Sequence, residues 1–334
     1  MISTKITDGA EFVVFDMEWN QPIYDKTYDF ETSELTGEII EIGAVKYVYD
    51  NGTLIKKGVF STDVRPRMYK QLHYHVKKVT NKTNKDLKKG VAFEAAYDSF
   101  VEFCGKDAIL VGWGNSDPHM LKMNLKFFDL DDNLGMYFLD LQPIFSLFAA
   151  QMGKQRSVEF AVDYYNIPKT GTFHSATADA IYTGAVFEAI FEHNQTAEVL
   201  SSISSSSIDP DIQSEFSFVG QDFEKAADCF APSEGFTSVC PVCGKKLKVK
   251  IGKFRIRKSE YALLSCSEHG EMFVRTRAKK NKNGRYYCAS VMRFATQNDY
   301  FLVASKQEEF RKYGDKGAPL PPPVTEETPK TEEI

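Results

Sequence analysis

The sequence has few cysteines, no long apolar run and no secretory pattern in its first residues, and each of these features argues against a class of protein. No apolar stretch approaches the ~18 residues of a membrane span, so we expect no membrane association. Six cysteines in 334 residues are too few for a disulfide framework and fit metal ligands plus free thiols better. Residues 1–8 lack the basic start and apolar core of a secretory signal, which predicts a cytoplasmic protein.

The formal net charge of −5 conceals two segments of opposite sign. Residues 240–293 hold 15 Lys and Arg against three acids, whereas the rest of the chain holds 26 against 43. A compact basic segment beside an acidic body is typical of a nucleic-acid contact module joined to a second function. The length also fits about two domains of ordinary size.

Strand-like and helix-like stretches alternate over the first part of the chain. A buried strand at 13–15 is followed by a hairpin of 38–49 and 54–62, joined by Asp50-Asn51-Gly52-Thr53. Further helices are predicted at 93–103, 117–128, 141–152, 156–165 and 175–192, and further strands at 108–113 and 136–139. This order predicts an α/β fold with a mixed sheet flanked by helices.

Composition sets the expected domain limits. The α/β domain is predicted at 8–193, and a Ser-rich linker, with a short helix near 222–229, at 194–236. A basic domain at 237–313 follows, and 314–334 is predicted to be a Pro-rich, acidic, disordered tail.

Asp16 and Glu18 stand two residues apart at the end of an apolar strand, so both side chains leave the same face. Carboxylates so placed repel each other and lose hydration, and a divalent cation removes that conflict. An ordinary half-exposed strand end is the common alternative, because such short motifs match by chance.

Asp117, His174 and Asp179 add two carboxylates and an imidazole. Five residues span about 140° around a helix, so His174 is expected just before the helix that carries Asp179. From a loop it could act as general base toward a water that metal ions have acidified. Four carboxylates and one imidazole are the groups needed to hold two divalent cations against a phosphodiester.

Three motifs in this order resemble the DEDDh 3′-to-5′ exonucleases, the superfamily of RNase T and the polymerase III proofreading subunit. The motifs are Phe15-Asp16-Met17-Glu18 followed by Glu41-Ile42-Gly43-Ala44-Val45, then Gly112-Trp113-Gly114-Asn115-Ser116-Asp117, then His174-x-Ala176-x-x-Asp179-Ala180. The resemblance covers about 11–190 and implies a ribonuclease-H-like fold. It also implies two Mg²⁺ or Mn²⁺ ions on Asp16, Glu18, Asp117 and Asp179, with His174 as general base.

Trp19 directly follows the first motif. An aromatic surface at this point would support the terminal base of a strand, which makes Trp19 a candidate nucleic-acid contact. Burial in the core is an equally weighted alternative, since tryptophan is largely buried on average.

A C-x₂-C-x₂₂-C-x₂-H pattern predicts a tetrahedral zinc site with no open position, and hence a structural metal. Its ligands are Cys240, Cys243, Cys266 and His269. A redox role for the first pair is the alternative, and Cys229 and Cys288 are possible substitute ligands.

Basic and apolar residues alternate around these cysteines, which predicts a zinc-ribbon-like β domain with one positive face. A solvated basic surface without a specific ligand is the alternative. The candidate nucleic-acid contacts are Lys246, Lys248, Lys250, Arg255, Arg257, Arg275 and Arg277.

The sequence therefore predicts a metal-dependent 3′-to-5′ exonuclease that acts on the 3′ ends of single-stranded RNA or DNA, with RNA slightly favoured. The basic domain would deliver or grip the substrate through its charge. A non-catalytic nucleic-acid-binding adaptor with the same fold is the alternative. The sequence predicts no particular protein partner.

Overall fold

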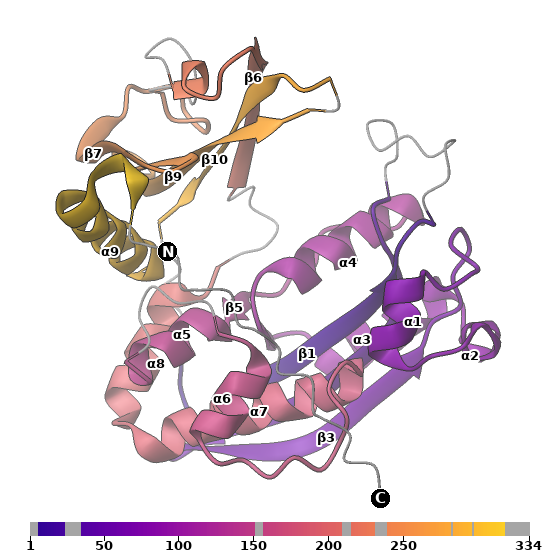
Figure 1. Cartoon of the computed structure of the whole chain (residues 1–334). Coiled ribbons are helices and arrows are strands. Elements are labelled where there is room, and N and C mark those ends of the chain that lie inside the picture. Colours follow the sequence, from indigo (N-terminus) through magenta and orange to yellow (C-terminus); the bar gives the residue numbers. More distant parts are fainter. Residues whose placement is uncertain are drawn as a thin grey trace, which may run out of the picture. The chain divides into compact units, whose positions relative to one another are not determined.

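Two sheets with different connectivity divide the chain into two units, Met1–Ser214 and Glu215–Ile334 (Figure 1). The structure is a computed structural model, and it describes residues 6–23, 35–150, 156–208, 215–230, 239–281, 283–295 and 297–317. Within these ranges, no helix combines the length and apolar character that a bilayer crossing requires.

The first unit contains a five-stranded mixed sheet of the ribonuclease-H-like kind, with strand order β3-β2-β1-β4-β5. The first three strands are antiparallel neighbours, whereas β4 and β5 run parallel to β1. The strands are β1 (Glu11–Asn20), β2 (Glu38–Asp50), β3 (Thr53–Asp63), β4 (Ile109–Gly112) and β5 (Phe138–Asp140).

Eight helices are described in this unit, and the longer ones cover the two faces of the sheet (Figure 1). Core residues of α3 and α4 pack on one face, and those of α5 to α8 pack on the other. The helices are α1 (Tyr74–Thr80), α2 (Asn84–Lys89), α3 (Phe93–Cys104), α4 (Ser116–Phe127), α5 (Leu141–Phe148), α6 (Val158–Tyr164), α7 (Ala176–His193) and α8 (Thr196–Ser206).

The period-two alternation of β1 assigns its side chains to these two layers. Phe12 meets Phe187 of α7 edge to face, with ring centroids 5.3 Å apart. Phe15, on the opposite face of β1, packs against Phe100 of α3 with ring centroids 5.8 Å apart. Even-numbered positions of β1 therefore face α7, and Asp16 and Glu18 belong to that set.

The second unit contains an antiparallel sheet with strand order β6-β10-β9-β8-β7. Helix α9 (Gln297–Tyr313) packs on this sheet through Val303, which is buried with Phe254 and Phe273. The strands are β6 (Glu215–Phe223), β7 (Lys248–Ile256), β8 (Ser259–Cys266), β9 (Gly270–Lys280) and β10 (Tyr286–Phe294), with short 3₁₀ turns at Asp228–Phe230 and Gly314–Lys316.

The expected linker at 194–236 contains regular structure. Helix α8 lies in it and buries Val199 and Ile203, whose spacing of four residues forms an apolar stripe that the serine-rich composition hides. Strand β6 then pairs with β10. The short helix expected near 222–229 is wrong, because β6 extends to Phe223 and only the turn at Asp228–Phe230 is helical.

The basic domain is larger than a zinc ribbon. It has five strands, and α9 was not predicted because most of its apolar residues form one contiguous run, Tyr300 to Ala304, without helical spacing. Of the predicted tail 314–334, the structure describes the turn Gly314–Lys316 and Gly317; the remainder lies outside the described residues.

Candidate active site

The hairpin register places a row of carboxylates across three strands of the first unit. Glu18 on β1 lies opposite Glu41 on β2, and Glu41 lies opposite Asp63 on β3. Directly opposed residues of antiparallel strands share a face, so all three carboxylates lie on the α7 side of the sheet. Asp16 is opposite Gly43 in the same register.

Gly43 allows the start of α7 to touch the sheet. A Cβ atom on Gly43 would lie 2.2 Å from the backbone nitrogen of Thr177 and 2.3 Å from the carbonyl carbon of Ala176. The helix is further held by the Thr177 hydroxyl, which donates to Ser61 Oγ on β3 at 2.7 Å. Close approach at this point brings Asp179, in the first turn of α7, toward Asp16 and Glu18.

Asp117 reaches the same end of β1 from the first turn of α4. Its buried carboxylate accepts a hydrogen bond from the Met17 backbone N–H at 3.0 Å. The preceding loop is fixed by Asp140, whose Oδ1 accepts from the N–H of Gly114 at 2.9 Å. Asp117 is thus joined to the residue that separates Asp16 from Glu18.

Glu18, His174 and Asp179 form a tight group, since each offers a ligand atom and these atoms lie within 4.8 Å of one another. His174 is exposed and lies just before α7, where sequence reasoning placed it. Its backbone has φ of 68°, and its N–H donates to Asp179 Oδ2 at 2.9 Å. This bond fixes the loop against the helix while the imidazole stays accessible.

Burial and crowding hold these carboxyl groups in their protonated form more strongly than usual. Burial and then the charges of Asp117 and Asp179 raise the pKa of Asp16. Burial and then the charge of Asp179 raise the pKa of Glu18 to about 7. Burial likewise raises the pKa of Asp117 to about 7 and also raises that of Asp179.

Divalent cations fit this donor set. Four carboxylates that repel one another in a buried place are stabilised as anions by positive charge at the same place. Carboxylate oxygens are also the ligands that Mg²⁺ and Mn²⁺ take in proteins.

Sequence reasoning missed a network beside the site. Glu41 Oε2 lies 2.8 Å from Lys82 Nζ, which is also 2.6 Å from Asp63 Oδ1. The Ser175 hydroxyl, which precedes α7, donates to Glu41 Oε1 at 3.0 Å. Lys82 also lowers the pKa of Glu18, against the larger effects that raise it. The place of Glu41 in the first motif was the available signal, whereas nothing marked Lys82.

Trp19 is half-buried, so one part of its side chain lies in the core and the other part is accessible to solvent. Its ring packs against Gly37, where a Cβ atom would lie 2.6 Å from Trp19 Cδ1, and it borders the α4 side of the core.

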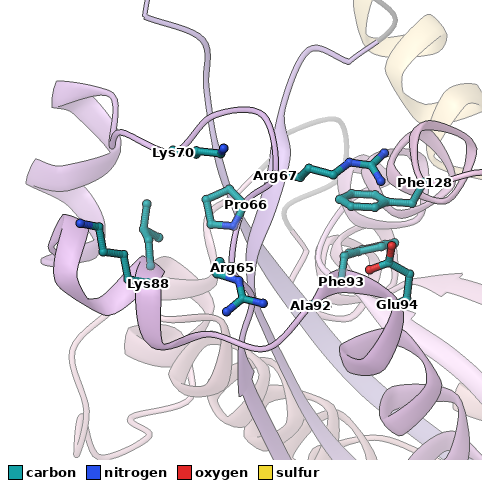
Figure 2. Close-up of a pocket in the computed structure, with 10 residues that line it drawn as sticks. Arg65, Pro66, Arg67, Lys70, Lys88, Ala92, Phe93, Glu94 and Phe128 are labelled. Carbon is teal, nitrogen blue, oxygen red and sulfur yellow. The ribbon is translucent and has the colours of Figure 1, made fainter.

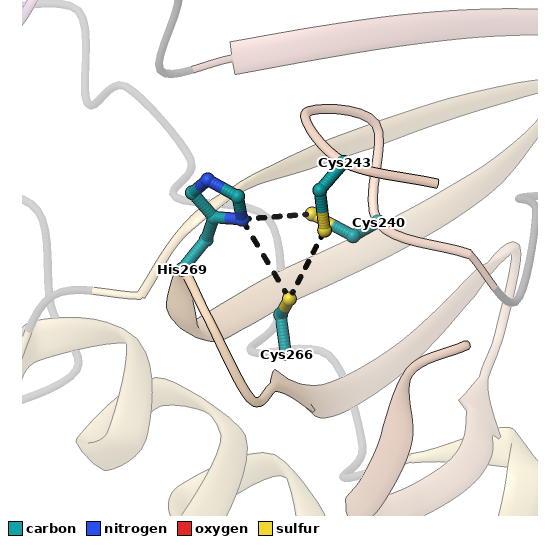
Figure 3. A group of neighbouring side chains, drawn as sticks. All are labelled: Cys240, Cys243, Cys266 and His269. Carbon is teal, nitrogen blue, oxygen red and sulfur yellow. Dashed lines mark hydrogen bonds between the residues drawn. The ribbon is translucent and has the colours of Figure 1, made fainter. Parts of the chain in front are cut away.

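The four predicted zinc ligands converge in the second unit (Figure 3). Cys240 Sγ and Cys266 Sγ each lie 3.7 Å from His269 Nδ1, and Cys243 Sγ lies 3.6 Å from Cys266 Sγ. Thiolates bound tetrahedrally to zinc at about 2.3 Å are about 3.8 Å apart, so these spacings fit the ion.

The turn at Cys266 favours a metal-binding thiolate. The backbone N–H groups of Glu268 and His269 lower the pKa of Cys266 to about 6. The substitute ligands Cys229 and Cys288 lie elsewhere, since they are buried together with Ala278 in a separate apolar cluster.

The seven predicted basic contacts do not share one face, so the single positive face was wrong. Arg255 lies opposite Glu260, and that register puts it on the face away from Arg275 and Arg277. There its guanidinium stacks over Phe230 at 5.3 Å and pairs with Asp315 at 3.4 Å. Arg255 is seven residues from Lys248, and the two one-residue register shifts of β7 cancel, so strand alternation itself puts these two cations on opposite faces.

The remaining basic residues divide between a strand edge and a sheet face. Lys246 and Lys248 are exposed near the zinc loop, Lys250 pairs with Glu271 at 2.6 Å, and Arg257 donates to the Lys316 carbonyl at 3.3 Å. On β9, the partly to fully exposed Arg275, Arg277 and Lys279 share the face of Tyr261 and Tyr287. Lys279 was not among the predicted contacts.

A ribonuclease-H-like mixed sheet that gathers four carboxylates and a histidine at the end of its first strand defines a phosphodiesterase-type domain of the nuclease class. Residues 27–187 match the exonuclease family model RNase_T. The chain is 27% identical over 187 residues to the probable 3′-5′ exonuclease KapD of Bacillus subtilis (strain 168), covering 56% of this chain and 87% of that protein.

Two solved structures are similar to the chain over about half of its length. The nuclease domain of 3′hExo, a DEDDh family member bound to rAMP, is 15% identical with a TM-score of 0.47, covering 55% of this chain and 92% of that one. Cell-death related nuclease 4 is 16% identical with a TM-score of 0.47, covering 55% and 64%. The chain thus spans less than two thirds of the latter protein.

The family model and the KapD relative together support a 3′-5′ exonuclease domain within the first unit, at residues 27–187. The predicted α/β fold and the predicted enzyme class are confirmed.

Proposed function

We propose that the chain hydrolyses single-stranded nucleic acid from the 3′ end, with the first unit as catalyst and the second as a nucleic-acid-binding module. The observation that carries the proposal is the convergence of Glu18, His174 and Asp179 within 4.8 Å, next to Asp16 and the buried Asp117.

Asp16, Glu18, Asp117 and Asp179 would hold two Mg²⁺ or Mn²⁺ ions. When bound, these ions would offset the carboxylate charge, acidify the attacking water and stabilise the departing 3′-oxygen. Asp117 is preorganised for this role, because its bond from Met17 N–H fixes it beside β1.

His174 would take the proton of the attacking water. Its accessible imidazole adjoins Glu18 and Asp179. The hydrogen bond from the His174 backbone N–H to Asp179 Oδ2 holds the loop, and with it the imidazole, beside these carboxylates. Glu41 holds the other side of this loop through Ser175. We assign Glu41 a positioning role.

The second unit would raise affinity for the strand. Arg275, Arg277 and Lys279 present cationic charge on a sheet face with Tyr287, whose ring can stack on a base. One zinc ion on the Cys₃His cluster would be structural, since all four coordination positions come from protein. RNA rather than DNA stays the favoured substrate, from the resemblance of the first motif to RNA-processing relatives.

The test is digestion of matched 5′-labelled RNA and DNA 12-mers with Mg²⁺ or Mn²⁺, and then with chelator. A ladder that shortens from the 3′ end and stops on chelation is the expected result.

His174→Ala should slow hydrolysis at least tenfold at neutral pH with metal affinity nearly unchanged, because a general base contributes 10²- to 10⁴-fold. His75→Ala, an exposed histidine on α1, is the control. Absence of digestion under all conditions would favour the adaptor alternative.

A further inference from the structure

A second cavity in the first unit is cationic and lies outside the carboxylate site. It has a volume of about 450 Å³ and opens between the loop after β3, helix α2 and the first turn of α3 (Figure 2). Its charged lining consists of four cations and a single acid: Arg65, Arg67, Lys70, Lys88 and Glu94.

Among the described residues, three of these cations have no acidic partner. Within the described part of the chain, no carboxylate lies within ion-pairing distance of Arg65, Lys70 or Lys88, and all three are exposed. Nearby lysines differ, since Lys82 pairs with Glu41 and Lys89 pairs with Asp86 at 3.6 Å. Uncompensated positive charge around a cavity attracts an anion.

The loop that carries three of the cations is held rigidly by buried polar side chains. Glu38 is 1% exposed and accepts hydrogen bonds from the backbone N–H groups of Arg67, Met68 and Tyr69. Asn20 is fully buried and donates to the carbonyls of Tyr69 and Gln71 at 2.8 and 2.7 Å. The cations are therefore presented in a fixed arrangement, as a binding surface requires.

Arg67 is preorganised within this loop. Its guanidinium stacks over Phe128 at 4.4 Å and Phe127 at 4.9 Å, and it donates to the Phe127 carbonyl at 3.1 Å. A guanidinium has five N–H donors in a planar fork, which leaves donors for the oxygens of a phosphate.

The cavity lies at the catalytic end of the sheet. Its loop continues from Asp63, which stands opposite Glu41, and Glu41 stands opposite Glu18. Neighbouring strands are about 4.8 Å apart, so Asp63 is about 10 Å from the catalytic strand. Glu38 and Asn20, which hold the loop, are themselves paired across β2 and β1.

We infer that this cavity binds the phosphodiester backbone of the substrate strand, on the 5′ side of the bond that is cleaved. The charged ends of the four cations lie around the cavity and do not converge on one point (Figure 2). Such a spread suits successive phosphates of an extended polyanion better than one small anion. The inference rests on the proposed function, because it takes a nucleic-acid strand as the substrate.

The test is binding of fluorescein-labelled 12-mer and 3-mer oligonucleotides to the full chain in chelator, by anisotropy over a salt series. The variant Arg65→Gln/Lys70→Gln/Lys88→Gln should bind the 12-mer at least tenfold more weakly. Each lost phosphate contact lowers the salt slope by about 0.7, so the slope should fall by about 2. The 3-mer should bind as in the unaltered protein.

The control is Lys57→Gln/Lys78→Gln/Lys85→Gln, which removes three exposed positive charges of the same unit outside the cavity. Equal 12-mer affinity and salt slope in the two triple variants would overturn the inference. So would equal loss for both lengths, or displacement of 12-mer and 3-mer alike by millimolar pyrophosphate, which would indicate a site for free anions.

The binding assay needs no catalysis, which separates the two proposals. A protein that binds the 12-mer through these cations but digests nothing with Mg²⁺ or Mn²⁺ would refute the nuclease proposal and leave this site standing. A protein that digests the 12-mer with the same KM in both triple variants would refute the cavity site and leave the nuclease proposal standing.

Discussion

At the scale of single residues, the candidate active site gathers four carboxyl groups whose ionisation is unfavourable. Asp16, Glu18, Asp117 and Asp179 all have raised pKa values, and burial is the largest cause in each case. Lys82 offsets a part of this at Glu18. The folded protein without metal therefore binds protons that the unfolded chain releases, and its stability falls as pH rises.

Glu18→Gln should raise the melting temperature of the metal-free protein at pH 8 and leave it unchanged at pH 4. The folded pKa of Glu18 is about 7 against an ordinary 4.5, so its unfavourable ionisation develops between these values and is complete above the higher one. Thermal melts in chelator measure the effect.

The matched control is Glu102→Gln, which neutralises an exposed carboxylate on α3. Saturating Mg²⁺ should stabilise the unaltered protein more than Glu18→Gln, because the variant has one anionic ligand fewer. A melting difference of equal size at pH 4 and pH 8 would contradict the ionisation account.

At the scale of elements, the site depends on the contact of α7 with β2. Asp179 and His174 come from one element and Asp16 and Glu18 from another, and Gly43 sets the distance between them. Displacement of the helix by even one ångström would separate the groups that must act together.

Gly43→Ala should reduce hydrolysis about 100-fold and also lower the melting temperature. The new Cβ atom would meet the α7 backbone at 2.2 Å, which forces the helix away from the sheet. Gly58→Ala on β3 is the control, since its Cβ atom would lie 3.5 Å from Phe103, an ordinary contact. Comparable activity in the two variants would show that the close approach is dispensable.

The zinc cluster holds two hairpin turns of the second unit together. Cys266→Ser should abolish bound zinc, which we expect at one per chain, and should lower the unfolding transition of the second unit by 10 °C or more. Structural zinc contributes directly to folding free energy in small domains. Metal analysis and calorimetry measure both quantities; an unchanged exonuclease-domain transition is the internal control, and zinc retained at full occupancy would exclude Cys266 as a ligand.

At the scale of the whole molecule, charge divides the labour between the units. The acidic body carries the carboxylates and the basic segment 240–293 carries 15 Lys and Arg. Under the proposed function, long-range attraction and counterion release would come largely from the second unit, while the chemistry would stay in the first.

Deletion of residues 215–334 should weaken 12-mer binding at least tenfold and flatten its salt dependence, with hydrolysis of dinucleotides kept within about twofold. The cut falls at Glu215 because β6 belongs to the second sheet. Anisotropy and initial rates give both values. Arg275→Gln/Arg277→Gln/Lys279→Gln in the full chain is the companion variant, and unchanged affinity in both proteins would remove the module from substrate binding.

Local pattern in the sequence was sufficient for much of this architecture. Alternation fixed the faces of β1, and the carboxylates, His174 and the zinc ligands could be named because their chemistry marks them at short spacing. Prediction failed where composition hid an apolar stripe, as at Val199 and Ile203, and where strand alternation itself put Arg255 and Lys248 on opposite faces of β7.

The tertiary structure alone decided which residues of distant segments contact one another. Lys82 joins Glu41 and Asp63, Gly43 admits α7, and Glu38 and Asn20 hold the loop of the cationic cavity. Each depends on strand register and on packing across tens of residues, and those quantities leave no periodic trace in the sequence. The types of chemical group were thus encoded locally, whereas their distances followed from the close packing of sheet and helices.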